Sequence, residues 1–289
     1  MKKRLNRTLP EILSVKDFGC ACNSYDIVGD IAIIRLTNNS KACGQSIAET
    51  IMTAHKNVKT VMAQTSAVGG EFRLRKLKHV AGEIKTHTVH RESGCQFNVD
   101  VEKCYFSPRL SHERIRIAGL VKDGETVVNM FAGVGCFSVL VAKHSNAKKV
   151  YSIDINPVAV KFMRENIRVN RAYSKVVPIL ADAKDLIQDK LSHVADRVLM
   201  PLPEKALAYL PYALRALKGG KGWIHYYGFE HARKKEDPVE KVKLKVSKKL
   251  NALGVAFEVP FERIVRSIGP NWYQAVLDIR TKPCGKEKQ

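Results

Sequence analysis

The sequence predicts an α/β domain built on a parallel sheet, preceded by a small α+β domain. From about Thr126 onward, short runs rich in β-branched residues alternate with helical runs. This alternation is typical of a parallel sheet covered by helices on both faces. Two strand-like runs at the end, 255–269 and 271–281, are joined by Gly-Pro and predict an antiparallel hairpin at the sheet edge.

Five strand-like runs make up the expected parallel part of the sheet, and each leads into a helical run. They are TVVNMF (126–131), KVYSID (149–154), KVVPILADA (175–183), DRVLMP (196–201) and GWIHYYG (222–228). The last of them leads into a charged run at 231–249, which we interpret mainly as a solvated helix face beyond a loop.

The first hundred residues have a different pattern. A helical stretch, 46–56, lies between two strand-like runs, and three more strand-like runs follow at 71–82, 86–94 and 95–106. We therefore expect a small α+β domain over 1–108, and the α/β domain over 109–289. A linking helix at 109–120, ending before Asp123-Gly124, opens the second domain.

The charge of the chain favours a polyanionic partner. Its 289 residues include 49 Lys and Arg but only 28 Asp and Glu, which gives a net charge of +21. Such a surplus is typical of proteins that contact nucleic-acid phosphates. No run approaches the roughly 18–20 apolar residues of a membrane span, and the basic N-terminus lacks the apolar core of a signal peptide. We expect a cytoplasmic protein that binds nucleic acid and no membrane.

The cysteines and histidines do not predict a metal site. The seven cysteines have no CxxC spacing, so we expect reduced, mostly buried thiols. The pair Cys20 and Cys22 leaves a redox or metal feature as the alternative. His79, His87 and His90 lie in a basic strand region without ordered Cys or carboxylate partners, and we interpret them as surface or RNA-facing side chains.

The stretch NMFAGVGCFS (129–138) places two glycines between a strand and a helix. Gly133 and Gly135 let the backbone pass close to a ligand at the carboxyl end of the sheet. A dinucleotide fold usually has a third small residue three positions after the second glycine. Here Ser138 follows Gly135 instead, and the turn is opened by Phe131-Ala132, which is bulky where a pyrophosphate would lie. We therefore disfavour NAD. A plain strand-to-helix turn is the simpler alternative.

Two acidic residues end the next two strands. Asp154 follows the glycines by roughly 20 residues, the spacing at which a carboxylate binds the ribose hydroxyls of an adenosine cofactor. Asp182 is placed to reach the adenine edge. Three strand ends that meet at one nucleoside favour S-adenosylmethionine as the cofactor. The predicted cofactor site comprises Phe131, Gly133, Gly135, Asp154, Ile155, Asp182, Ala183 and Met200.

A set of motifs in fixed order resembles a known family. The motifs are GGEFRLRKL, CYFSPRLSHERIRI, NMFAGVGCFS, DRVLMPLPE, GWIHYY and IVRSIGPNWYQAVLDI. They resemble the archaeal and eukaryotic-type tRNA (guanine-N1) methyltransferase family, over about residues 25 to 282. That family acts on the nucleotide 3′ of the anticodon, and its superfamily includes the aminocarboxypropyl transferase of wybutosine synthesis.

The resemblance implies a small middle domain followed by a class I S-adenosylmethionine-dependent methyltransferase (Rossmann-like) domain. Full-length members also have an N-terminal domain that contacts the outer corner of the tRNA. We expect the segment ahead of Asp26 to be too short for it.

The resemblance also implies roles for individual residues. Arg73 would bind the guanine carbonyl, Tyr105 would line the base pocket, and Glu113 would be the general base. Pro203 closes the strand-four motif and joins this catalytic set. Without the resemblance, Glu113 beside Arg114 would be interpreted as a surface ion pair, and Arg73 as an exposed strand residue or a phosphate contact.

Two positions depart from the family pattern. Pro201 stands where the family usually has Asn, and a proline cannot supply that amide hydrogen bond. The backbone carbonyls near Met200 and Pro201 could accept from a base instead. Asn129 stands where the family commonly has Asp, which removes one negative charge near the sulfonium.

We therefore predict a tRNA methyltransferase that modifies N1 of the guanosine at position 37 of the anticodon stem-loop, or a guanosine-derived tricyclic base there. Transfer of the aminocarboxypropyl group to the same nucleotide is the alternative, although Pro203 favours the methyltransferase branch. A third hypothesis is an RNA-binding protein with a degenerate cofactor fold, which the intact Gly133, Gly135 and Asp154 disfavour. We expect a monomer without a metal.

Overall fold

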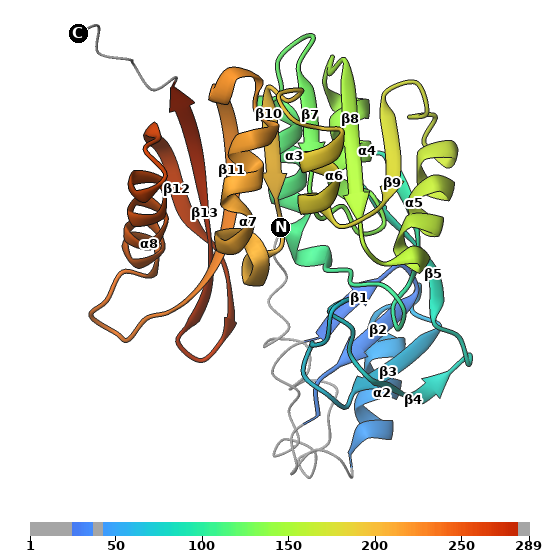
Figure 1. Ribbon diagram of the computed structural model, residues 1–289. Helices are drawn as coiled ribbons and strands as arrows, with labels where there is room; N and C mark the ends of the chain where they lie inside the picture. Colours follow the sequence, from blue (N-terminus) through green and yellow to red (C-terminus); the bar gives the residue numbers. More distant parts are fainter. Residues whose placement is uncertain (1–24, 37–42, 283–289) are drawn as a thin grey trace, which may run out of the picture. The chain divides into compact units, whose positions relative to one another are not determined.

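The computed structural model describes residues 25–36 and 43–282. The chain divides into two compact units, which meet in the sequence between Arg109 and Leu110. Each unit has its own secondary structure and core, and each is described by itself (Figure 1).

The first unit has a four-stranded mixed sheet with one helix. Its elements are β1 (Tyr25–Val28), β2 (Ile31–Ile34), α2 (Gly44–Ala54), β3 (Thr60–Gln64) and β4 (Leu77–Gly82), with the strand order β1-β2-β3-β4. β2 and β3 are parallel, because α2 connects them. Apolar residues of α2 pack with those of β2 and β3 in one core. β5 (His87–Glu92) and β6 (Cys95–Asp100) form a separate antiparallel hairpin.

The expected strand at 71–82 is only half formed. β4 begins at Leu77, because the preceding residues form a turn closed by a bridge between Gly69 and Leu74. Within that turn Arg73 has a positive φ of 55°. The interpretation of Arg73 as an exposed strand residue is therefore wrong, and its side chain is placed by a turn.

The second unit has the predicted parallel sheet with its antiparallel hairpin. A 3₁₀ turn (Pro108–Leu110) and α3 (Ser111–Leu120) precede seven strands: β7 (Thr126–Asn129), β8 (Lys149–Asp154), β9 (Val176–Leu180), β10 (Arg197–Met200), β11 (Gly222–His231), β12 (Ala256–Gly269) and β13 (Trp272–Lys282). The strand order is β12-β13-β11-β10-β7-β8-β9. Five strands are parallel, whereas β13 pairs antiparallel with both β11 and β12. The predicted fold class is confirmed.

Helices follow each of the five parallel strands. They are α4 (Cys136–His144), α5 (Pro157–Val169), α6 (Ala183–Asp189), α7 (Pro203–Ala216) and α8 (Pro238–Ala252). α6, α7 and α8 pack in one apolar cluster with one face of the sheet. From β7 the chain adds β8 and β9 on one side of that strand, and it then returns to place β10 on the other side. In such sheets ligands bind at this switch point, at the carboxyl ends of the strands.

The thiol prediction holds in part. Cys95, Cys104 and Cys136 are buried thiols. Cys43 takes part in a disulfide bond, so the expectation of reduced thiols is wrong there. Cys20 and Cys22 lie outside the described residues.

Within 25–36 and 43–282, no cluster of three or more His, Cys, Asp or Glu residues could hold a metal ion. None of the helices in these ranges has the length and apolar character of a membrane-spanning helix.

Candidate active site at the carboxyl edge of the sheet

The glycine turn after β7 is held by contacts from three elements. Gly135 has a φ of 92°, and a Cβ there would lie 2.8 Å from Met163 Cγ, so both backbone geometry and packing require glycine. Asn166 of α5 donates to the Val134 carbonyl at 2.9 Å. Asn129 is fully buried, and its amide donates to Ser138 Oγ at 3.1 Å. Asn129 thus contributes to the turn through a neutral hydrogen bond.

Asp154 ends β8 with its carboxylate against this turn. One oxygen accepts from Gly133 N at 2.6 Å and the other from Asn156 N at 2.9 Å. Burial raises the pKa of Asp154, although the backbone N–H groups of Asn156, Gly133 and Ile155 act in the opposite direction. Ile155 beside it is half-buried. The turn and the carboxylate therefore form one unit at the strand ends.

Asp182 follows β9 and caps α6, where it accepts from Lys184 N at 2.9 Å. The Tyr209 hydroxyl of α7 donates to both Asp182 oxygens, at 3.0 and 2.8 Å. Burial and the Asp182 carboxylate raise the pKa of Tyr209. The Tyr209 ring also contacts Phe131 edge-on, with the ring centroids 5.2 Å apart. Sequence reasoning missed Tyr209, because nothing in the sequence marks which α7 residue faces this strand end.

The fourth strand end is buried. Met200 is 0% exposed and its side chain belongs to the apolar core. Pro203 is the first residue of α7, a position that needs no backbone N–H. The Leu202 carbonyl accepts from Ala206 N at 3.0 Å. Ala183 is buried in the same core as Met200.

The strand ends present groups that fit an adenosine cofactor. Asp154 and Asp182 are acceptors for ribose hydroxyls and an exocyclic amine, and the half-buried Phe131 and Ile155 supply apolar surface. The turn at Gly133 brings backbone within reach of the Asp154 carboxylate. The Asp154 carboxylate, which contacts the turn, disfavours a pyrophosphate there, in agreement with the sequence argument against NAD.

Arg73 and Tyr105 lie together in the first unit. The Arg73 guanidinium lies over the Tyr105 ring, 4.1 Å from its centroid. Stacking of this kind holds a guanidinium in a fixed plane. These two predicted pocket residues are therefore in contact with each other.

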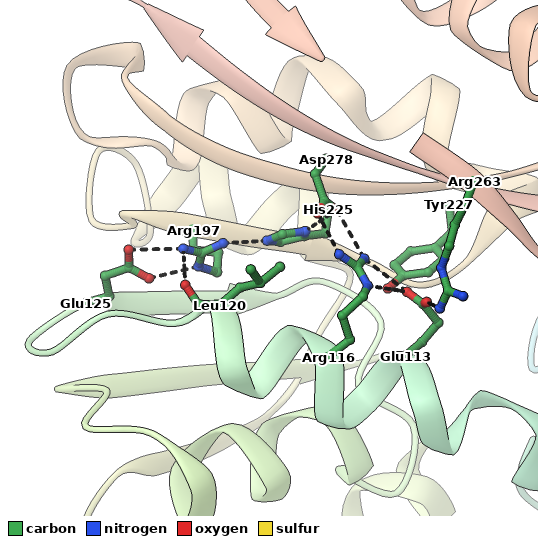
Figure 2. A network of polar contacts seen from close by, with 9 residues as sticks. All are labelled: Glu113, Arg116, Leu120, Glu125, Arg197, His225, Tyr227, Arg263 and Asp278. Atoms are coloured by element: carbon green, nitrogen blue, oxygen red, sulfur yellow. Dashed lines mark hydrogen bonds and ion pairs between the residues drawn. The ribbon is translucent and has the colours of Figure 1, made fainter. Parts of the chain in front are cut away.

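Glu113 lies in the first turn of α3 and is only 1% exposed (Figure 2). Its Oε2 accepts from Arg116 Nη2 at 3.0 Å and from the Tyr227 hydroxyl at 3.0 Å, and its Oε1 contacts Arg263 Nη2. The interpretation as a surface pair with Arg114 is wrong, because the Glu113 side chain is 1% exposed and its ion-pair partners are Arg116 and Arg263.

Strand register places Glu113 near the carboxyl end of the parallel strands. Tyr226 pairs with Met200, the last residue of β10, so Tyr227 lies just past the carboxyl end of that strand. The Tyr227 ring also contacts Phe137 of α4, with the centroids 6.2 Å apart. α4 begins directly after Gly135. Glu113, through Tyr227, thus lies on the same edge as the glycine turn.

A chain of buried polar groups extends from Glu113 across the sheet (Figure 2). Arg116 binds Asp278 at 2.6 Å, and Asp278 accepts from His225 Nδ1 at 2.6 Å. His225 Nε2 accepts from Arg197, which also binds Glu125. Because an arginine only donates, His225 carries its proton on Nδ1.

The pKa shifts agree with this pattern. Burial lowers the pKa of His225, although Asp278 opposes the shift, so the imidazole is neutral. Burial alone would raise the pKa of Asp278, but hydrogen bonds from His225 and Arg116 lower it to about 2. The network thus contains three arginines (Arg116, Arg197 and Arg263) and three carboxylates (Glu113, Glu125 and Asp278), and its charges balance.

The first unit has a groove of about 810 Å³ between the β1–β2 turn and β5. Asp30 in its wall accepts from Lys85 at 2.7 Å and from Thr88 at 2.6 Å. Lys59 and Arg91 line the groove, are exposed, and form no ion pair within the described residues. The groove therefore presents uncompensated positive charge.

Comparison with known proteins identifies the family. Residues 88–254 match the TRM5/TYW2 methyltransferase domain, and residues 5–86 match the TYW2 N-terminal domain. The chain belongs to the TRM5/TYW2 methyltransferase family. The family resemblance expected from the motifs is confirmed.

Relatives within the TRM5/TYW2 family act on position 37 of tRNA. The tRNA (guanine(37)-N(1))-methyltransferase Trm5b of Pyrococcus abyssi is 42% identical over 257 residues, which is 89% of this chain and 74% of the relative. The tRNA 4-demethylwyosine(37)-methyltransferase Taw21 of Saccharolobus solfataricus is 40% identical over 256 residues, covering 88% of this chain and 92% of the relative.

Solved structures of TRM5/TYW2 proteins share the fold. The complex of aTrm5 with tRNALeu aligns with a TM-score of 0.77 and 35% identity, over 96% of this chain and 75% of that one. The Methanocaldococcus jannaschii TYW2 complex with AdoMet aligns with a TM-score of 0.64 and 30% identity, over 90% and 99%. As in its family, the cofactor of this chain is S-adenosylmethionine.

Proposed function

We propose that this protein transfers the methyl group of S-adenosylmethionine to N1 of the guanosine at position 37 of tRNA, 3′ of the anticodon. The observation that carries the proposal is the buried Glu113 carboxylate, held at the edge of the sheet where the glycine turn and Asp154 lie. The 42% identity to a tRNA (guanine(37)-N(1))-methyltransferase supports the choice of acceptor.

The proposed chemistry assigns the proton and the charge to two side chains. When bound, S-adenosylmethionine supplies an electrophilic methyl carbon. Guanine N1 forms the new bond to that carbon as the carbon–sulfur bond breaks, and the N1 proton passes to Glu113. Arg73 stabilises the charge that develops on O6, and Tyr105, in contact with Arg73, lines the pocket of the extruded base. Pro203 and the neighbouring carbonyls shape the pocket floor.

The cofactor site in this proposal is the set predicted from the sequence. Asp154 would bind the ribose hydroxyls and Asp182 the adenine amine. Phe131, Ile155, Ala183 and the Met200 backbone would flank the base, and Gly133 and Gly135 would let the cofactor approach. The RNA partner is the anticodon stem-loop of tRNA, and the protein acts as a monomer in the cytoplasm.

Replacement of Glu113 tests the proposal. Glu113→Gln keeps the shape and a hydrogen-bonding end but cannot accept the N1 proton, and loss of a general base usually slows a reaction by about 10²–10⁴-fold. We expect a slowdown of that size in single-turnover methyl transfer to unmodified tRNA, with S-adenosylmethionine affinity retained. Transfer at a near wild-type rate would remove Glu113 from the mechanism.

A second candidate acceptor is a guanosine-derived tricyclic base at the same position. Pro201 stands where the family usually has Asn, so the amide that helps to hold guanine is missing. The 40% identity to a 4-demethylwyosine(37)-methyltransferase favours this base. Transfer of the aminocarboxypropyl group is the further alternative, which the TYW2 N-terminal match keeps open. Parallel reactions with methyl-labelled and carboxyl-labelled cofactor separate the two transfers.

A further inference from the structure

The two oxygens of the Glu113 carboxylate have unequal surroundings. Oε2 accepts three hydrogen bonds, two from Arg116 and one from Tyr227. Oε1 accepts from Arg263 alone among the described residues. One side of the carboxylate is thus heavily bound, and the other depends on a single side chain (Figure 2).

The partners on the Oε2 side are fixed. Arg116 also binds Asp278 through both terminal nitrogens, at 2.6 and 3.2 Å, and its guanidinium lies 4.6 Å from the Phe261 ring centroid. Tyr227 is 1% exposed and lies in the middle of the sheet, where β11 pairs with β13. Moving either partner would break other buried contacts.

Arg263 is held differently. It comes from β12, the edge strand of the sheet, and its side chain is 41% exposed. Register places it opposite Val276, which itself pairs with Tyr227, so Arg263 approaches Glu113 from the face of the sheet on which Tyr227 lies. Its contact with Glu113 can be exchanged for water without disturbing the core.

We propose that Arg263 is an exchangeable counter-ion of Glu113: it covers Oε1 in the free protein and leaves when the target base arrives, so that Oε1 can accept the proton. This inference rests on the proposed function. With Arg263 in place the carboxylate is 1% exposed, and no substrate atom reaches it until one partner moves. Arg263, with a side chain 41% exposed against 19% for Arg116, is the most exposed of the partners.

The balance of charge explains why Arg263 is needed before the base binds. The buried network holds three arginines and three carboxylates, with a neutral His225. Without Arg263 one buried negative charge would be uncompensated, which favours protonation of a carboxyl group. Arg263 is therefore a positioning residue that keeps Glu113 ready as a carboxylate.

The pH dependence of methyl transfer can be measured separately for the free protein and for the complex with tRNA and cofactor. Single-turnover rates at sub-saturating enzyme report the free protein, whereas rates at saturation report the ternary complex. In Arg263→Met, we expect the pH midpoint of the sub-saturating profile to rise by about one unit or more. The midpoint of the saturated profile should stay at the wild-type value. Arg263→Lys keeps the charge and should restore the sub-saturating midpoint.

Arg280→Met is the matched control. Arg280 lies on the same hairpin, is similarly exposed, and pairs with Glu258 at the surface. Neither midpoint should move in this variant. A shift of both midpoints in Arg263→Met would mean that Arg263 stays on Glu113 in the complex, and no shift at all would mean that it does not act on Glu113. Either result overturns the proposal.

A stability measurement tests the contact independently of the reaction. In urea unfolding of the protein without tRNA, the losses of stability from Arg263→Met and Glu113→Gln should be non-additive, because the two side chains share one contact. Additive losses would contradict the proposal. If the losses are non-additive but Glu113→Gln is fully active, the contact between Arg263 and Glu113 exists in the free protein, but Glu113 is not the general base.

Discussion

Asp154 is the residue on which the proposed cofactor site depends most directly. Its carboxylate already accepts from Gly133 N and Asn156 N, so it is oriented without the cofactor. Two ribose hydroxyls that donate to a charged acceptor contribute about 1.5–3 kcal/mol each. Asp154→Ala should therefore lower S-adenosylmethionine affinity by about 100-fold or more in calorimetry. Asp185→Ala removes an exposed carboxylate from α6 and should leave the affinity unchanged. Equal affinities for the two variants would remove Asp154 from the site.

Asp278 gives the network a measurable dependence on pH. Its pKa in the folded protein, about 2, lies below the ordinary value of 3.8. The stabilisation is therefore fully present above pH 3.8 and is lost as pH falls from about 4 toward 2. A shift of this size corresponds to about 2 kcal/mol. We expect the wild-type free energy of unfolding to fall by that much in this window, relative to Asp278→Asn. Parallel pH profiles would contradict the pairing.

At the scale of elements, the sequence predicted most of the second unit. Five strand–helix units and the final hairpin could be recognised because buried parallel strands are apolar runs and helices separate them. The boundary of β4 could not, since Gly69, Gly70 and the bridge to Leu74 override the alternation that continues through Arg73. A turn that depends on positive φ values at Gly70 and Arg73 is not visible in a hydrophobic pattern.

Most partners of Glu113 could not be predicted from the sequence either. Arg116 lies three residues away on α3, a spacing that a helix argument could have found. Tyr227, Arg263 and Asp278 come from β11, β12 and β13, and they meet α3 only through the register of the hairpin. No local pattern encodes that register, so the motif order led to Glu113 but not to the groups that hold it.

At the scale of the whole molecule, the net charge of +21 predicts binding that weakens with salt. The exposed Lys59 and Arg91 in the groove of the first unit are candidate phosphate contacts. Replacing both with Ala should lower the slope of log affinity against log salt by about one to two. Lys235→Ala with Lys248→Ala removes equal charge from the run 231–249, and its slope should stay near the wild-type value. Equal slopes in the two double variants would show that the groove does not contact tRNA.

The identity of the modified nucleoside is the most direct test of the central claim. The wild-type protein is incubated with unmodified tRNA that carries guanosine at position 37 and with methyl-labelled S-adenosylmethionine, and the digested RNA is analysed by mass spectrometry. We expect labelled 1-methylguanosine at position 37, and we expect this label to be lost when the tRNA carries adenosine there. Methyl label at any other nucleoside would contradict the proposed function. So would the absence of methyl label together with label transferred from carboxyl-labelled S-adenosylmethionine.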